Sequence, residues 1–141
     1  MTNQRQIERL GMAYLAEKLL SVGIRLAFPE FDSGIDFIAY FTDGRFLSAP
    51  VQLKSSTQQG FYTNKKYLQI PDLRIVYLWH VGLDLSKIRA FCLPYHKAEE
   101  IVDVQKRSRK DGVYFTQASK HLLEELNLFE VTSWTDSLFA K

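Results

Sequence analysis

The sequence predicts an α/β protein in which a mixed central β-sheet is flanked by helices. Apolar residues recur at helical spacing near the start of the chain, and strand-like segments follow that include one almost continuous apolar run. A second helical pattern lies near the C-terminus. The chain has 141 residues, of which 46% are hydrophobic, which is enough for one compact core. We therefore expect a single domain over residues 1–141.

The first expected element is a helix over residues 4–22. Its apolar residues keep helical spacing, and Gly23 follows as a stop signal. A turn at Asp43-Gly44 separates strand-like segments in the next part of the chain. Three segments rich in strand formers are found there: residues 25–31, 35–41 and 46–54. Together they predict a three-stranded meander.

The second half of the chain begins with an apolar run over residues 73–81, which is typical of a strand covered on both faces. A shorter strand is expected over residues 88–93, and Pro94 then opens a helix. A last helix is expected from about Gln117. The apolar residues near the C-terminus either complete the core or supply a contact between copies of the chain: Phe129, Val131, Trp134, Leu138 and Phe139.

The polar N-terminus and the lack of any apolar run near the roughly 20 residues that span a bilayer argue against secretion and membrane insertion. The only cysteine, Cys92, lies in an apolar run, which suits a buried thiol in a reducing compartment. We therefore expect a cytoplasmic protein without membrane partners.

The net charge is only +2, so any acidic polymer must be bound by a local basic patch. Two clusters are candidates for contacts with DNA phosphates: Lys65 and Lys66, and then Lys106, Arg107, Arg109 and Lys110. The alternative for each cluster is an ordinary solvated surface. For the tyrosines of this region, including Tyr62, packing is favoured over contacts with a ligand.

The segment around Gln52 and Lys54 separates polar from apolar side chains. Side chains two residues apart share one face of a strand, so Gln52 and Lys54 point the same way. Val51 and Leu53 point to the opposite face, into the core. The end of this strand therefore presents an amide and an ammonium group side by side.

Asp36 lies between two apolar residues of the preceding strand-like segment, a setting in which a carboxylate needs a partner. A two-residue loop at Asp43-Gly44 would place Asp36 on the same face as Val51. A three-residue loop, or a bulge near Pro50, would place Asp36 opposite or diagonal to Gln52. We predict an odd loop or a bulge, because only that register brings the polar groups together.

Glu8 is the helix acid that we expect to join this site. Helical spacing places Glu8 in the apolar arc of Met12 and Leu15. Glu17 falls outside that arc. A core-facing carboxylate near the start of the helix would reach the sheet edge where Asp36 is expected.

The order of helix, strand, Gly34-Ile35-Asp36, hairpin and Gln52-Leu53-Lys54 resembles the PD-(D/E)XK nuclease superfamily, in the variant whose motif ends in Gln-x-Lys. The resemblance covers residues 8–56 best and is to small single-domain members. It implies a restriction-endonuclease-like αβββαβ core. At two positions the chain departs from the pattern: Ile35 stands where the motif has Pro, and Met12 stands where such relatives often carry Glu.

The resemblance also implies an endonuclease that needs Mg²⁺, with Mn²⁺ as a substitute. Oxygen ligands would come from the Asp36 carboxylate, the Gln52 side chain, the Leu53 backbone carbonyl and Glu8. Lys54 would hold the attacking water or the transition-state oxygens. The implied substrate is double-stranded DNA, cut in a site-specific or structure-specific way, as by homing or restriction-like enzymes. One site per chain suggests a homodimer or a higher homo-oligomer.

Other chemistries fit less well. The three histidines, His80, His96 and His121, lack the spacing of metal ligands, and the chain has neither a glycine-rich phosphate loop nor a Gly-x-Ser-x-Gly elbow. The main alternative is a DNA-binding or assembly module that kept the fold and lost the chemistry, which Met12 and Gln52 favour. A protein-interaction domain that does not bind DNA is the second alternative.

Overall fold

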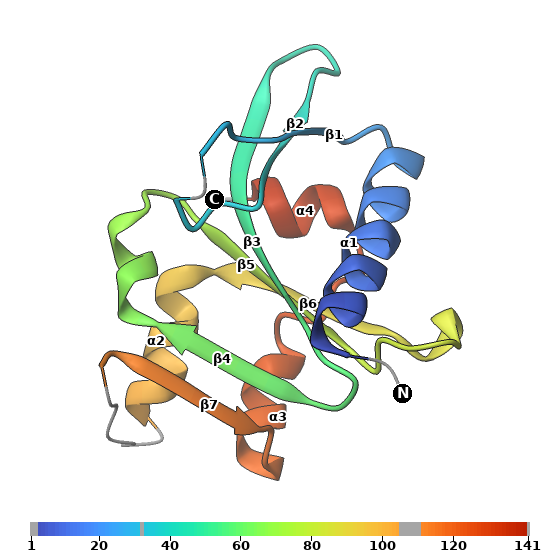
Figure 1. The fold of residues 1–141 in the computed structure, drawn as a ribbon. Coiled ribbons are helices and arrows are strands. Elements are labelled where there is room, and N and C mark those ends of the chain that lie inside the picture. Colours follow the sequence, from blue (N-terminus) through green and yellow to red (C-terminus); the bar gives the residue numbers. More distant parts are fainter. Residues whose placement is uncertain (1–2, 32, 105–110, 141) are drawn as a thin grey trace.

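The computed structural model describes residues 3–31, 33–104 and 111–140 (Figure 1). The α-helices are α1 (Gln4–Ser21), α2 (Tyr95–Val104), α3 (Lys120–Asn127) and α4 (Trp134–Phe139). The strands are β1 (Arg25–Ala27), β2 (Phe37–Phe41), β3 (Leu47–Ser55), β4 (Gly60–Asn64), β5 (Arg74–Trp79), β6 (Arg89–Pro94) and β7 (Val113–Gln117). Two short 3-10 helices are η1 (Lys65–Gln69) and η2 (Leu85–Lys87).

Five strands form a mixed sheet in the order β1-β2-β3-β5-β6. Strands β3 and β5 are parallel, and the other neighbours in this sheet are antiparallel. Strands β4 and β7 form a separate two-stranded antiparallel ribbon. The predicted α/β class with a mixed sheet flanked by helices is confirmed.

The connection between β3 and β5 differs from the αβββαβ order, which would place an α-helix there. Residues 56–73 contain β4 and η1 instead. In β4, Phe61 and Thr63 are buried while Tyr62 is partly exposed, which is the two-residue period of a strand. Pro71 lies shortly after η1, and a proline prevents a helix from continuing.

The side chains of β5 supply both faces of the sheet with core residues, as its continuous apolar run predicts. Ile75, Tyr77 and Trp79 belong to a cluster with residues of α2, α3 and β4. Val76 and Leu78 belong to a second cluster with residues of α1 and α4. The sheet is therefore covered on one side by α1 and α4, and on the other by α2, α3 and β4.

The C-terminal segment completes the core. Leu138 of α4 is 1% exposed, and Val131, Trp134 and Phe139 pack against the same cluster. The backbone before α4 lies along β6, where Cys92 donates its N–H to the Phe129 carbonyl oxygen. Of the two alternatives for these apolar residues, completion of the core is the one that the structure supports.

Helix α1 lies close to the end of β3. Its buried residues include Gly11 and Leu15, and a Cβ atom on Gly11 would overlap the side chain of Ser55. A capping box fixes the start of the helix, because Gln6 N–H donates to the Asn3 side chain at 2.9 Å and Asn3 N–H donates to the Gln6 side chain at 3.0 Å. Gln4 Nε2 donates to the Ser55 carbonyl oxygen at 3.5 Å, so the first turn of α1 lies beside the end of β3.

Cys92 lies on β6 with 4% of its surface exposed, and burial raises the pKa of its thiol to about 12. The expectation of a buried thiol is confirmed. Among the helices that the structure describes, none is both long and apolar enough to cross a bilayer.

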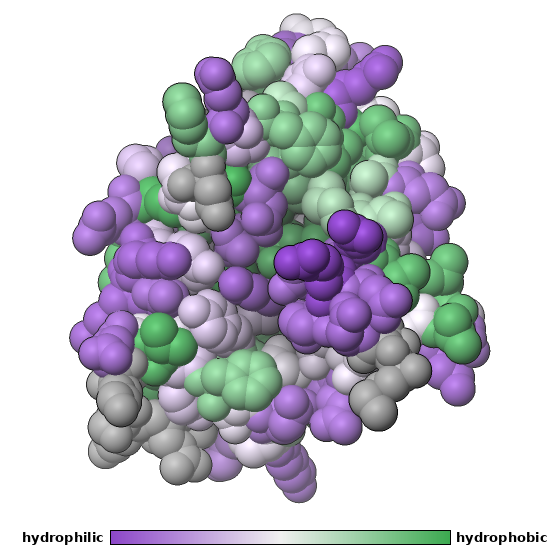
Figure 2. Space-filling model, in the orientation of Figure 1, coloured by the Kyte–Doolittle hydropathy of each residue, from purple (hydrophilic) through white to green (hydrophobic). Residues whose placement is uncertain are grey.

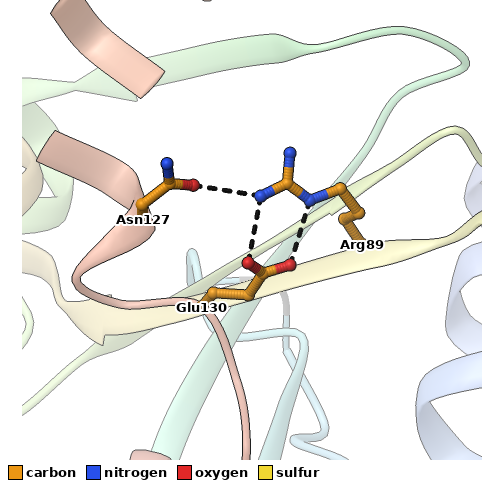
Figure 3. Close-up of polar contacts among 3 residues, drawn as sticks. All are labelled: Arg89, Asn127 and Glu130. Carbon is orange, nitrogen blue, oxygen red and sulfur yellow. Dashed lines mark hydrogen bonds and ion pairs between the residues drawn. The ribbon is translucent and has the colours of Figure 1, made fainter. Parts of the chain in front are cut away.

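Arg89 joins β6 to the C-terminal segment (Figure 3). Its guanidinium donates two hydrogen bonds of 3.0 Å to the Glu130 carboxylate and one of 3.0 Å to the side-chain oxygen of Asn127. The hydrogen bond from Arg89 lowers the pKa of Glu130 below its ordinary value of 4.5. Both side chains of this ion pair are about one third exposed, so solvent screens it.

Glu130→Gln is expected to reduce the free energy of unfolding at neutral pH by less than about 1 kcal/mol, as for other exposed ion pairs. A carboxylate with a lowered pKa in the folded state stabilises the fold above its ordinary pKa, and this contribution is lost as pH falls through the lowered value. Urea denaturation between pH 7 and pH 3 should show the difference between wild type and variant shrinking in acid. Glu124→Gln, at an exposed position on α3, is the control. A difference that does not change with pH would contradict the prediction.

Candidate active site

The hairpin of β2 and β3 has the register that the site requires. Phe37 pairs with Val51 and Phe41 pairs with Leu47, so the connecting loop covers residues 42–46. This loop has an odd number of residues, as predicted, although it is longer than the three-residue form. If the pairing extended back by one position from Phe37, the first residue of β2, Asp36 would lie opposite Gln52.

Asp36 lies just before β2 and not within a strand, and its side chain is exposed, which corrects the expectation of a carboxylate enclosed by apolar neighbours. The Asp36 N–H donates to the Val51 carbonyl oxygen at 2.8 Å. Its carboxylate oxygen Oδ2 accepts a hydrogen bond of 2.7 Å from the Leu53 N–H. The carboxylate thus takes the place of a strand partner where β3 extends beyond β2, and this bond fixes its position.

Beyond Val51, the strand β3 is paired with β5 on one side and open on the other. The Leu53 N–H points to this open edge, since it reaches Asp36 there. The Leu53 carbonyl oxygen accepts from the Gln52 amide Nε2 at 3.5 Å, so the Gln52 amide lies beside it. Gln52 itself is 7% exposed. The open edge therefore combines a carboxylate, an amide and a backbone carbonyl.

Lys54 points to the face of the sheet that carries the β4–β7 ribbon. Its Nζ lies 4.3 Å from the ring centre of Tyr62 and 5.7 Å from that of Tyr67. The backbone of Tyr62 is anchored to β5, because its carbonyl oxygen accepts a hydrogen bond of 2.6 Å from the Tyr77 hydroxyl. The hydroxyl of Tyr62 accepts from the Asn64 side chain at 3.3 Å. The ammonium group is thus positioned by an aromatic face that is itself anchored.

These groups line one cleft of about 700 Å³. Its lining residues come from the start of α1, the end of β3 and the β4–β7 ribbon. Figure 1 shows α1 and the ribbon on either side of the end of β3. Figure 2 shows hydrophilic residues across the middle of this face, with single hydrophobic residues among them over the β4–β7 ribbon. The predicted site residues in the cleft are Glu8, Asp36, Gln52, Leu53 and Lys54.

The expectation that Glu8 faces the core is wrong, since its side chain is exposed. The buried stripe of α1 is made of Ile7, Gly11, Leu15 and Leu19, and Glu8 lies next to it on the side that lines the cleft. Glycine is not among the apolar residues whose spacing predicts the buried side of the helix, so Gly11 did not contribute to that prediction. Glu8 nevertheless shares the cleft with the other predicted residues.

The oxygen donors of the cleft suit a hard divalent cation such as Mg²⁺. Asp36 and Glu8 provide carboxylates, and Gln52 and Leu53 provide neutral oxygens beside the open edge. Within the part of the chain that the structure describes, no three His, Cys, Asp or Glu side chains converge as a metal-binding group. A cation here would rely on amide and backbone oxygens as well as carboxylates.

The first basic cluster, Lys65 and Lys66, is exposed at the start of η1, directly after β4. Lys65 is tied to the residue directly before β7, because its N–H donates to the Gly112 carbonyl oxygen at 3.0 Å. The residues of the second cluster, Lys106, Arg107, Arg109 and Lys110, lie outside the described residues.

The sequence did not reveal the β4–β7 wall. This wall brings Gly60, Tyr62, Phe115 and Gln117 to the cleft. The alternation of buried Phe61 and Thr63 around Tyr62 was the available signal, but the segment is short and its partner strand is distant in sequence.

The sequence matches no protein-family model and has no match among the curated proteins with which it was compared.

Proposed function

We propose that this chain is a metal-dependent endonuclease that hydrolyses phosphodiester bonds of DNA. The observation that carries the proposal is the meeting of Asp36, Gln52 and Lys54 at the open end of β3, in one cleft. The alternation of side chains along β3 explains why Gln52 and Lys54 share a face. Asp36 joins them only because of the register of the β2–β3 hairpin. The proposal includes membership of the PD-(D/E)XK superfamily in its Gln-x-Lys form.

Each residue has a distinct role in the proposed reaction. Mg²⁺, when bound, supplies positive charge that offsets the charge developing on the phosphate and promotes ionisation of water. Asp36 presents a carboxylate whose orientation is fixed by the Leu53 N–H. Lys54 holds the attacking water or a phosphate oxygen through its ammonium group. Gln52 offers an amide oxygen, and Glu8 contributes a second negative charge from the α1 wall.

Gln52 supplies an oxygen without the charge of a second acid on the strand, so metal affinity in the absence of DNA should be weak. The phosphates of the substrate would then complete the ligand set. On double-stranded DNA, one site per chain implies that a homodimer or higher homo-oligomer cuts both strands. Lys65 and Lys66 are exposed directly after β4, and in this proposal they contact phosphates beyond the cleft.

A DNA-binding or assembly module without catalysis is the second candidate. The exposure of Glu8 and the presence of only two carboxylates among the cleft residues favour it. In that case the cleft would bind the DNA backbone through Lys54 without cutting it.

A plasmid-nicking assay with Mg²⁺ or Mn²⁺ separates the two candidates. Wild-type protein should nick the plasmid, EDTA should abolish nicking, and Asp36→Asn should reduce the rate more than about 100-fold because it removes a metal-binding charge while keeping the side-chain shape. Asp43→Asn, an exposed site in the loop at the other end of the hairpin, is the matched control. Nicking that is equal in wild type and Asp36→Asn would reject the endonuclease.

A further inference from the structure

Two exposed phenylalanines line the cleft. Phe28 is 67% exposed and Phe115 is 60% exposed, and both share the cleft with Asp36 and Lys54. Neither ring is needed to fill the core. A single exposed ring is common on protein surfaces, so the observation that points to a binding role is that both rings line the same polar cleft.

Phe115 and Tyr62 form an aromatic platform on the β4–β7 ribbon. They are directly paired across the two strands, so their side chains stand on the same face. The Phe115 ring lies over Gly60, where an added Cβ atom would be 3.4 Å from it. The Lys54 ammonium group lies over the ring of the neighbouring Tyr62.

Phe28 contributes a ring from a different part of the fold. It follows β1, and its ring is tilted against the buried Phe37 with the ring centres 6.4 Å apart. Phe37 anchors one side of the Phe28 ring while the rest is exposed. The two phenylalanines thus present aromatic surface from separate elements, with the polar floor of the cleft in common.

We propose, on the basis of the endonuclease function above, that the DNA strand in the cleft is locally unpaired and that Phe28 and Phe115 stack on its bases next to the scissile phosphate. The bases of an intact duplex are already stacked on each other, so an aromatic side chain reaches a base face only where the strand is open. Stacking also supplies affinity that the net charge of +2 does not. The substrate class is therefore DNA with an unpaired segment, within or joined to a duplex.

The test measures binding without cleavage, in EDTA, by fluorescence anisotropy. The probes are a short labelled duplex and the same duplex with a run of mismatches at its centre. Wild-type protein should bind the mismatched probe more tightly. Phe28→Leu and Phe115→Leu, which keep an apolar side chain but lose the ring, should each weaken that binding by roughly 5- to 100-fold. Phe28→Tyr and Phe115→Tyr should restore it, since they keep the ring.

Phe46→Leu is the matched control, because Phe46 is 68% exposed but lies in the loop before β3 and does not line the cleft. A mismatched probe with 2-aminopurine should lose fluorescence on binding wild-type protein if its bases stack on a ring. Leucine variants that bind like the wild type, or equal affinity of the wild type for both probes, would overturn the proposal.

The two proposals fail in different ways. If wild-type protein nicks DNA and Asp36→Asn does not, while the leucine variants bind as well as wild type, the endonuclease stands and the stacking is rejected. If the leucine variants lose binding to mismatched DNA while wild type and Asp36→Asn nick equally or not at all, the endonuclease is rejected and only the binding of unpaired DNA by the two rings stands.

Discussion

Lys54→Ala is expected to lower the single-turnover rate of plasmid nicking by about 100- to 1000-fold, the range for the loss of one transition-state hydrogen-bond donor. The Lys54 side chain lies on the polar face of β3, and its ammonium group lies over the Tyr62 ring at 4.3 Å. No core residue depends on it, so the variant should fold normally. A rate measured at saturating protein reports the chemical step separately from binding.

DNA affinity in EDTA should change far less than the rate, because one phosphate contact lowers affinity by a small factor and reduces the salt dependence by about one unit of slope. Lys65→Ala is the matched control, since it removes an exposed lysine near the cleft and leaves Lys54 in place. It should affect affinity and its salt dependence and leave the rate at saturation unchanged. Equal rates for wild type and Lys54→Ala would remove Lys54 from the reaction.

Much of this site follows from the sequence because strand alternation is a local property. The two-residue period places Gln52 and Lys54 on one face without knowledge of the fold. The register was also predictable, since only an odd loop brings Asp36 towards Gln52, and the structure confirms that parity. The buried strand β5 could be recognised because both its faces are covered, so it contains few polar residues.

The sequence does not predict features that depend on contacts between distant segments of the chain. Glu8 was expected to face the core because apolar spacing defined the stripe of α1, whereas the close approach of Gly11 to Ser55 shifts the buried side away from Glu8. Strands β4 and β7 pair although η1, β5, η2, β6 and α2 lie between them in the chain, so neither segment carries a local signal of the pairing. Their aromatic residues were therefore not recognised as part of the cleft.

Trp79 is the residue whose loss is expected to destabilise the fold most. Its side chain is fully buried, and its ring centre lies 4.4 Å from that of Phe91. Its indole N–H donates to the carbonyl oxygen of Gly60 at 2.9 Å. The residue thus connects the main sheet to the first residue of β4, which forms a wall of the cleft.

Trp79→Ala is expected to reduce the free energy of unfolding by about 3–5 kcal/mol, the usual cost of removing a buried tryptophan side chain. That loss is a large fraction of the roughly 5–15 kcal/mol that stabilises a typical domain. Urea denaturation followed by far-UV circular dichroism measures it without relying on tryptophan fluorescence. A loss below about 1 kcal/mol would contradict the packing described for Trp79.

Trp79→Phe separates the packing of the ring from its hydrogen bond. Phenylalanine fills part of the same space against Phe91 but cannot donate to the Gly60 carbonyl oxygen, so a smaller loss of about 1–3 kcal/mol is expected. Trp134→Phe is the matched control, because Trp134 lies on α4 against the opposite core cluster and has no part in the cleft. If the bond to Gly60 holds the wall in place, Trp79→Phe should also weaken DNA binding under conditions in which it remains folded, while Trp134→Phe should not.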